Sequence, residues 1–335
     1  MSDSKTVKSK SKKKAVEVKK QPAKKLTVAF CGLTLQIYSG PKRFADELKR
    51  GFKALGYQIS DVKQLTPKHD TPDICVVWNN LTPREAASVE VARKAGSKIM
   101  IMELGFIQRA NHCQIDSEGF SHNASWRHNL KKKLDDSDLK YLDSELPDCN
   151  KVKARDGYIL VLGQISGDTQ LYDSAIKTMQ QLERLIARNV PSTKEIYFRP
   201  HPIAADTVHQ GKALIQRMPI AENEDLFYKS NQRGNSLDKA LEGAAFIITI
   251  NSTAIIEATI AGVPCLALGP SIAIDAGAAL QATPQSISGD IQKMVDGWEP
   301  EPYTVDNFLH GVLTNQHHIK TLSDPEKVAE LIATL

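Results

Sequence analysis

The residues with the clearest chemical potential lie where an apolar run gives way to a helical one, in the segment Asn251–Pro264 (NSTAIIEATIAGVP). Ser252 and Thr253 occupy the junction, where exposed backbone N–H groups and the helix dipole favour a phosphate. Glu257 follows about one helical turn later, where its carboxylate is placed to accept hydrogen bonds from ribose hydroxyls. The pattern predicts a nucleotide site with Ser252, Thr253 and Glu257 as ligands. The alternative is a capped helix that carries a solvated glutamate.

A second group of polar residues follows the strand-like run Glu195–Phe198 and reads Arg199-Pro200-His201-Pro202. Prolines on both sides of the histidine hold the backbone extended and prevent a helix from forming. The imidazole is therefore presented at a strand end with Arg199 beside it, a cationic pair suited to a departing phosphate or diphosphate. Arg199 and His201 are predicted to bind this leaving group. A purely structural histidine is the alternative.

Two carboxylates compete for the role of general base. Glu103 leaves the apolar strand-like run Lys98–Met102 and is followed by Gly105. A carboxylate at that point can take a proton from a hydroxyl, provided that burial keeps its pKa useful. Capping of a loop is an equal alternative for Glu103. Asp116, further along the chain, competes for the same catalytic role.

Further polar residues extend the predicted site. Gln164 and Asp168, in a glycine-bearing loop after an apolar run, are expected to line the donor side, with a plain loop as the alternative. Gly40, Asn79 and Arg109 are expected on the acceptor side, because each lies in a loop that follows a predicted strand. The sequence has no Walker loop and no zinc signature, so neither a metal nor a permanently bound cofactor is expected.

An alternation of strands and helices must position these residues. The first part of the chain has apolar strand-like runs and amphipathic helical patterns at Leu26–Cys31, Pro41–Leu55, Asp73–Trp78, Pro83–Ala95 and Lys98–Met102. Alternation of short strands with helices of about 10–15 residues is typical of βαβ units in a parallel sheet.

The alternation fails between Lys131 and Asp156, where charges gather, and then restarts. The second part has the expected elements Gly157–Leu162, Tyr172–Asn189, Glu195–Phe198, Phe246–Ile250, Ser252–Ala261 and Pro264–Leu268. The sequence therefore predicts an α/β protein of two doubly wound domains, residues 26–150 and 151–335. In such sheets ligands bind at the carboxyl ends of the strands, so both domains are expected to face one cleft.

Charge is distributed unevenly along the 335 residues. Residues 1–25 contain ten lysines and two acidic residues with no apolar periodicity, so they are predicted to be a disordered basic tail on a mildly acidic body. A hydrophobic content of 41% excludes a wholly disordered or fibrous chain. Five scattered cysteines predict reduced thiols in a cytoplasmic protein, and neither a signal peptide nor a membrane span is expected. His317 and His318 are expected on an exposed helix surface.

The order of the motifs resembles that of capsule-polysaccharide-type glycosyltransferases, a group that includes Kdo transferases and phage-encoded relatives. It is similar, more remotely, to that of bacterial sialyltransferases. The resemblance extends over roughly residues 26–330. It depends on an acidic-x-Gly element, a strand followed by Gly-Gln-x-x-x-Asp, a His-Pro pair and Ser-Thr-x-x-x-Glu-Ala-x-x-x-Gly-x-Pro. It implies the GT-B fold, in which two Rossmann-like domains face a central cleft.

This resemblance also implies roles for individual residues. Glu103 matches the acidic motif that supplies the base, and His201 matches the residue that stabilises the departing nucleotide. Ser252 and Thr253 match the phosphate-binding hydroxyls. Leu104 occupies the position of the second acidic residue of the family, so Asp116 remains an alternative base.

By resemblance, the chain is expected to transfer a sugar from a UDP- or CMP-sugar, held by the C-terminal domain, to an acceptor hydroxyl held by the N-terminal domain. The basic tail slightly favours DNA as the acceptor, namely a hydroxymethylated pyrimidine of phage DNA flipped into the cleft in the host cytoplasm. A capsule or lipopolysaccharide glycosyltransferase, a GT-B-like sugar-nucleotide epimerase and a non-catalytic nucleotide-binding protein are the alternatives. The donor sugar, the stereochemical outcome and the oligomeric state stay open.

Overall fold

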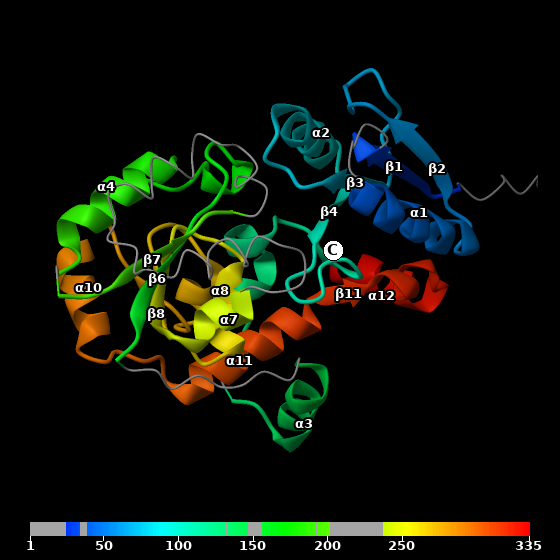
Figure 1. Ribbon diagram of the computed structural model, residues 1–335. Coiled ribbons are helices and arrows are strands. Elements are labelled where there is room, and N and C mark those ends of the chain that lie inside the picture. Colours follow the sequence, from blue (N-terminus) through cyan, green and yellow to red (C-terminus); the bar gives the residue numbers. More distant parts are fainter. Residues whose placement is uncertain (1–24, 34–38, 132, 147–155, 192, 202–236) are drawn as a thin grey trace, which may run out of the picture.

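The computed structural model describes residues 25–33, 39–131, 133–146, 156–191, 193–201 and 237–335. These residues form two β-sheets that lie side by side, each covered by helices (Figure 1). Both sheets consist mainly of parallel strands joined through helices, so the predicted α/β class with two doubly wound units is confirmed. Residues 1–24, nearly all of the predicted basic tail, lie outside the described residues.

The first sheet has the strand order β11-β5-β4-β3-β1-β2. Strands β2, β1, β3 and β4 are parallel, whereas β5 runs antiparallel to β4 and β11 runs antiparallel to β5. The residues that follow β3 and β4 therefore lie together at one edge of the sheet. The strands are β1 (Thr27–Cys31), β2 (Gln58–Val62), β3 (Ile74–Trp78), β4 (Lys98–Leu104), β5 (His112–Asp116) and β11 (Gln316–His318).

Helices cover both faces of the first sheet. Helices α1 (Ser39–Ala54) and α12 (Pro325–Thr334) pack on one face, where Phe44 and Val328 contribute to the same apolar cluster. Helix α2 (Pro83–Lys94) covers the opposite face. Successive strand side chains point to opposite faces, so the inner strands are buried on both sides and appear in the sequence as continuous apolar runs.

The second sheet has the strand order β10-β9-β8-β6-β7, and all of its strands are parallel. Helices α4 and α10 pack on one face, and α7, α8, α9 and α11 on the other. The strands are β6 (Tyr158–Leu162), β7 (Ile196–Arg199), β8 (Ala244–Thr249), β9 (Cys265–Ala267) and β10 (Leu280–Gln281). The helices are α4 (Met179–Asn189), α7 (Leu237–Glu242), α8 (Ala254–Ile260), α9 (Ile272–Asp275), α10 (Ile287–Val295) and α11 (Pro302–Thr314).

The chain after β5 packs on the second half of the molecule, although the predicted boundary assigned residues 26–150 to the first. This stretch forms the short helices η2 (Ser121–Asn123) and η3 (Ser125–His128) and then α3 (Asp136–Glu145). Trp126 and Leu142 belong to the apolar cluster that covers one face of the second sheet. The ring of Trp126 also meets that of Phe106 edge-on, with centroids 5.8 Å apart.

The C-terminal segment, placed by the sequence in a second domain of residues 151–335, returns to the first half of the molecule. Strand β11 pairs with β5, and η5 (Ile319–Ser323) and α12 lie beside α1, red next to blue in Figure 1. His317 and His318, predicted on a helix surface, therefore lie in a strand. Burial lowers the pKa of His317 to about 4. A three-residue strand is too short to show an alternating pattern, so the sequence does not reveal it.

One predicted helix also begins later than expected. The predicted span Tyr172–Asn189 becomes a helix only at Met179. Thr178 and Gln181 form a capping box, in which Thr178 Oγ1 accepts from the N–H of Gln181 (3.2 Å) and Gln181 Oε1 accepts from the N–H of Thr178 (3.1 Å). In this exchange the backbone N–H groups of Thr178 and Gln181 bond to side chains. In a longer helix they would bond to carbonyls of the preceding turn, so the capping box fixes the start of the helix.

Within the described residues, no helix has both the length and the apolar character required to cross a lipid bilayer. Four cysteines of the described residues are buried and unpaired by disulfides: Cys31, Cys75, Cys113 and Cys265.

Gln316 connects the returning strand to the loop after β4. Its Oε1 accepts hydrogen bonds from the backbone N–H groups of Phe106 (3.0 Å) and Ile107 (2.9 Å). Gln316→Leu should lower the free energy of unfolding by about 1–3 kcal/mol, because both donors lose their acceptor. Urea unfolding of the full chain measures the change. Gln316→Glu keeps an acceptor oxygen and should lose less; a leucine variant as stable as the wild type would contradict this role.

Candidate active site

Glu103 lies at the carboxyl end of β4, next to the end of β3. Its Oε1 accepts a hydrogen bond from the N–H of Leu104 (2.8 Å), and its Oε2 accepts one from the side-chain amide of Asn79 (3.4 Å). Asn79 has a left-handed backbone with φ 37°, and its N–H donates to the carbonyl of Met102 (2.8 Å). Backbone strain of this kind is common where a polar side chain is positioned for function. The predicted base and a predicted acceptor residue are thus in contact.

The carboxyl group of Glu103 has a pKa above its ordinary value. Burial is the main cause, and the negative charge of Asp168 acts in the same direction. Hydrogen bonds from Leu104 and Asn79 and the positive charge of Arg109 oppose this rise in the pKa. A raised pKa makes the carboxylate a better proton acceptor near neutral pH, so the environment suits a general base.

Arg109 links the two halves of the molecule. It lies in the loop between β4 and β5, and its Nη1 donates to Oγ1 of Thr253, which precedes α8 (3.1 Å). Gly105 allows this loop to turn tightly, because a Cβ at that position would lie 2.6 Å from the Cβ of His112. Gln108 adopts a left-handed backbone with φ 49°. The glycine of the predicted acidic-x-Gly element therefore shapes the loop that carries Arg109.

Arg199 is the last residue of β7, and His201 follows two residues later; Pro202 lies outside the described residues. Both side chains are half-buried. Burial lowers the pKa of His201; the positive charges of Arg199 and Arg109 act in the same direction, and Asp168 opposes them. A lowered pKa reduces the positive charge that His201 carries near neutral pH. The two arginines carry the positive charge in this part of the site.

Ser252, Thr253 and Glu257 lie where β8 gives way to α8. Oγ of Ser252 accepts from the backbone N–H two residues on (3.3 Å), and Oγ1 of Thr253 accepts from Arg109. Burial raises the pKa of Glu257, and the positive charges of Arg109 and Arg199 oppose the rise. Oε2 of Glu257 is buried and has no hydrogen-bond partner among the described residues. Such an unsatisfied acceptor is destabilising, and a hydroxyl donor from a ligand relieves the cost.

Gln164 and Asp168 play different parts. Gln164 and Asn251 form a reciprocal pair: Nε2 of Gln164 donates to Oδ1 of Asn251 (2.9 Å), and the N–H of Asn251 donates to Oε1 of Gln164 (3.0 Å). Both residues are buried, so this pair ties the end of β6 to the end of β8. Asp168 accepts from a backbone N–H through Oδ1 (3.0 Å), and its charge acts on both Glu103 and His201.

Asp116, the competing base, is buried at the end of β5. Its Oδ1 accepts from the N–H groups of Glu118 (2.7 Å) and Gly119 (3.1 Å). Its Oδ2 accepts from the N–H (2.9 Å) and the hydroxyl (2.7 Å) of Ser125. These bonds hold the turn after β5 against η3 and occupy both carboxylate oxygens. Asp116 accepts four hydrogen bonds from the turn that it holds, whereas Glu103 accepts two, and which of the two is the base stays a prediction.

Contacts and mutual charge effects bring together predicted residues from both halves: Asn79, Glu103, Arg109, Asp168, Arg199, His201, Thr253 and Glu257. Gly40 lies in the first turn of α1. Sequence reasoning did not single out Asn251 as a site residue, although an asparagine directly after a buried strand was a visible signal. Its role as the partner of Gln164 depends on two strands brought side by side, which spacing along the chain does not reveal.

Comparisons with known proteins agree with this architecture. A model of the family described as capsule polysaccharide biosynthesis protein matches residues 128–289. The solved KpsC β-Kdo 2,7-transferase of Thermosulfurimonas dismutans superposes with a TM-score of 0.53 at 16% identity, covering 92% of this chain and 99% of that chain. The KpsC β-Kdo 2,4-transferase of the same organism gives a TM-score of 0.51 at 11% identity, covering 88% and 92%. No curated protein matches the sequence.

These likenesses confirm the predicted GT-B fold and the predicted resemblance to capsule-polysaccharide-type enzymes. The family match begins within η3 and ends within α10, so it covers most of the second half and none of the first sheet. The predicted relations to phage-encoded enzymes and to sialyltransferases stay predictions.

Proposed function

We propose that this chain is a glycosyltransferase that uses a nucleotide sugar as donor. The observation that carries the proposal is that the charge of Arg109 acts on both Glu103 of the first half and His201 of the second, while Arg109 contacts Thr253 across the two halves of a GT-B fold. Sugar transfer needs a base for the acceptor hydroxyl and positive charge for the departing phosphate. The match to the capsule polysaccharide biosynthesis family supports the same class of enzyme.

In the proposed reaction, the sugar passes to the acceptor oxygen, and the proton of that hydroxyl passes to Glu103. The bond between the sugar and the nucleotide's phosphate breaks, and the nucleotide leaves with the bonding electrons. Arg199 and Arg109 stabilise the negative charge that develops, and His201 donates a hydrogen bond or accepts a proton as that charge appears. Asn79 holds the carboxylate of Glu103 in place.

The donor is proposed to bind to the second half of the molecule. Glu257 supplies an unpaired, buried carboxylate oxygen for the ribose hydroxyls, close to two arginines whose charges act on it. Thr253 is already hydrogen-bonded to Arg109, so a phosphate beside this pair meets both a hydroxyl and a guanidinium. The acceptor then approaches from the first half, where Asn79 and Glu103 lie.

The acceptor is proposed to be a glycan hydroxyl, as in a capsule or lipopolysaccharide enzyme. Two observations support this choice: the description of the matching family, and the Kdo-transferase titles of the two solved neighbours. The sequence-based preference for a hydroxymethylated pyrimidine in DNA depends on residues 1–25, of which only Lys25 is described. DNA is therefore the second candidate acceptor, and the epimerase activity is the third alternative.

One experiment separates these possibilities. The full chain is incubated with a mixture of UDP- and CMP-sugars and either capsule oligosaccharides or hydroxymethylated DNA, and products are identified by mass spectrometry. A glycosylated oligosaccharide supports the proposal, whereas a glycosylated nucleoside moves DNA to first place. Conversion of the donor without any acceptor indicates an epimerase. Nucleotide binding without turnover on any acceptor contradicts an enzymatic role.

Glu257→Ala should weaken nucleotide binding by about 10- to 150-fold, since a charge-assisted pair of hydrogen bonds is worth roughly 1.5–3 kcal/mol. Calorimetric titration with UDP and CMP measures the change. Glu257→Gln keeps one acceptor oxygen and should lose less affinity. Glu242→Ala, on the exposed side of α7, is the matched control. Unchanged affinity in a folded Glu257→Ala variant would show that this helix only packs in the core.

A further inference from the structure

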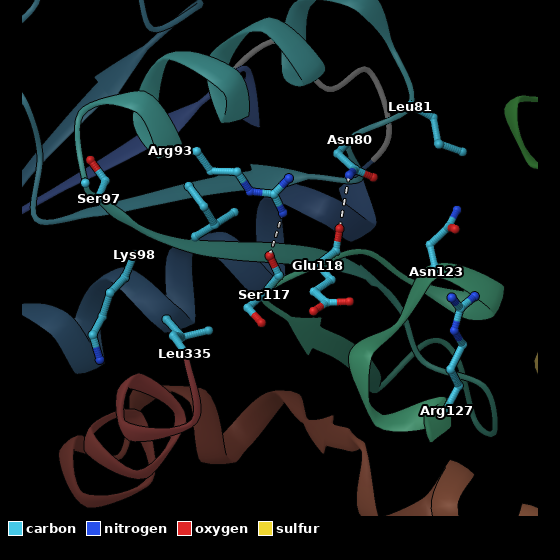
Figure 2. A pocket seen from close by; sticks show the side chains of 12 residues that line it. Asn80, Leu81, Arg93, Ser97, Lys98, Ser117, Glu118, Asn123, Arg127 and Leu335 are labelled. Atoms are coloured by element: carbon cyan, nitrogen blue, oxygen red, sulfur yellow. Dashed lines mark hydrogen bonds between the residues drawn. The ribbon is translucent and has the colours of Figure 1, made fainter. Parts of the chain in front are cut away.

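A polar groove lies on the first half of the molecule, beside the candidate active site and lined by none of its residues. It has a volume of about 780 Å³ and lies between the end of α2, the start of β4, the turn after β5 and the helices η2 and η3 (Figure 2). Charged and amide side chains line it: Arg93, Lys98, Arg127, Glu118, Asn80 and Asn123. This volume falls within the range of roughly 300–1,000 Å³ that is usual for ligand sites.

One residue that lines the groove, Asn80, is the sequence neighbour of Asn79, which contacts the candidate base. Asn79 donates to Oε2 of Glu103, and the next residue, Asn80, lines the groove and donates from Nδ2 to the carbonyl of Glu118 (3.4 Å). Oδ1 of Asn80 is buried without a hydrogen-bond partner among the described residues. A hydroxyl donor from a ligand relieves the cost of this unsatisfied oxygen. The Asn80 end of the groove therefore lies nearest to Glu103, whereas Lys98, at the start of β4, lies five residues before Glu103, about 16 Å along the strand.

Two of the lining cations are fixed without being neutralised. Nη2 of Arg93 donates to the backbone carbonyl of Ser117 (3.1 Å), a contact drawn in Figure 2. Nζ of Lys98 donates to the backbone carbonyl of Ile332 in α12 (2.7 Å). Because these acceptors are uncharged, the bonds hold the two side chains at the groove and leave their positive charge available to an anion.

With Arg127 as the third cation and Glu118 as the acidic side chain, the lining of the groove keeps a positive net charge. Arg127 reaches Asp275 only at 3.9 Å, and Asp275 is 41% exposed, so the pair is weak. Glu118 carries the one negative charge among the side chains that line the groove in the described part of the chain. Leu335, the last residue of the sequence, also lines the groove and adds its main-chain carboxylate, so three cations against two carboxylates leave a small positive charge that favours an anionic ligand.

We propose that this groove binds a carboxylate-bearing segment of the acceptor glycan, an inference that depends on the proposed function. Arg93, Lys98 and Arg127 contact the carboxylates, and the amides of Asn80 and Asn123 hydrogen-bond to sugar hydroxyls. A glycan suits the groove better than a duplex does. Nucleic-acid binding draws on a basic stripe that follows many phosphates, whereas only three cationic side chains line this groove.

Direct binding tests the inference without requiring turnover. Fluorescently labelled hexagalacturonate serves as a carboxylated probe and labelled maltohexaose as a neutral one, each titrated with the full chain and followed by anisotropy. The double variant Arg93→Glu/Lys98→Glu should weaken hexagalacturonate binding roughly 10- to 100-fold and leave maltohexaose binding unchanged. Both side chains are exposed, so the variant should fold. Lys94→Glu is the matched control, because Lys94 pairs with Glu90 outside the groove (2.6 Å).

Three outcomes overturn the inference. One is unchanged hexagalacturonate affinity in the double variant, and another is an equal loss in Lys94→Glu. The third is tighter binding of a duplex DNA oligonucleotide that depends on Arg93 and Lys98, which assigns the groove to nucleic acid. Nucleotide affinity and sugar transfer are measured separately on the same proteins. Retention of both while the glycan result fails removes the groove inference and leaves the proposed function intact.

Discussion

Replacing Glu103 by glutamine is expected to lower kcat by about 10²–10⁴-fold, the range associated with loss of a general base. Glutamine has nearly the same size, and its oxygen still accepts from the N–H of Leu104, so the end of β4 keeps its shape. The amide cannot take the acceptor proton. The KM for the donor should change little, because the donor is proposed to bind through Glu257 and the arginines of the second half.

The pH dependence gives this prediction a sharper test. The base works only when it is deprotonated, so kcat/KM of the wild type should rise as the pH passes upward through the raised pKa of Glu103 and then level off. The hydrogen bond from Asn79 lowers that pKa. Asn79→Ala should therefore move the acidic limb of the profile to higher pH, and Glu103→Gln should abolish the limb.

Two further variants separate the candidate bases. Asp116→Asn should lower the melting temperature, since Asp116 holds a turn through four hydrogen bonds, and should leave the acidic limb in place. Glu90→Gln, exposed on α2, is a neutral control for loss of a carboxylate. If Glu103→Gln keeps wild-type turnover with the same pH profile, Glu103 is not the base.

His201→Ala is expected to lower kcat by about 10²–10³-fold, the scale of one lost electrostatic stabiliser. The charges of Arg199, Arg109 and Asp168 all act on the pKa of the His201 imidazole. Its half-buried position at a strand end means that the substitution should change the melting temperature little. The arginines remain, so nucleotide binding should survive while the step that releases the phosphate slows.

Proton uptake provides an independent readout for His201. Its pKa is low in the ligand-free protein, and a bound phosphate should raise it, because the negative charge favours the imidazolium. Nucleotide binding should therefore take up protons at mildly acidic pH, which calorimetry in buffers of different ionisation enthalpy detects. His201→Ala should remove this uptake, whereas His69→Ala, in an exposed loop, should not. Near-normal kcat and unchanged uptake in His201→Ala would remove the residue from the mechanism.

The inner strands and the residues that follow them were predictable from the sequence. Strand β3 is buried on both faces, so its sequence ICVVW is a continuous apolar run that identifies it. Residues directly after such runs lie at the carboxyl edge of a parallel sheet, which is why Asn79, Glu103 and Arg199 could be assigned to one region. Ser252 and Thr253, the hydroxyl pair before α8, could be predicted in the same way, because they closely follow the apolar run of β8.

Strands at the sheet edges were not predictable. Strand β2, with the sequence QISDV, is largely exposed and lacks a regular alternation, and β11 is a polar triplet. Their pairing depends on contacts between residues far apart in the chain, as between Gln316 and Gln114. The structural hydrogen bonds of Asp116 and Gln164 could not be predicted either, because tertiary packing alone decides which partners they have.

The return of the C-terminal segment to the first sheet has a mechanical consequence. The polypeptide passes between the halves twice, once after β5 and once between α11 and β11, so the halves are tethered at two points rather than one. When two stretches of polypeptide join the halves, the halves can rotate most easily about the line through these two connections. Twisting about other axes and separation of the halves both meet more resistance. Ser121, with φ 52°, lies in η2, on the first of these two connections. Each half therefore contains segments from both ends of the chain, so cleaving the polypeptide near residue 150 would leave neither half complete.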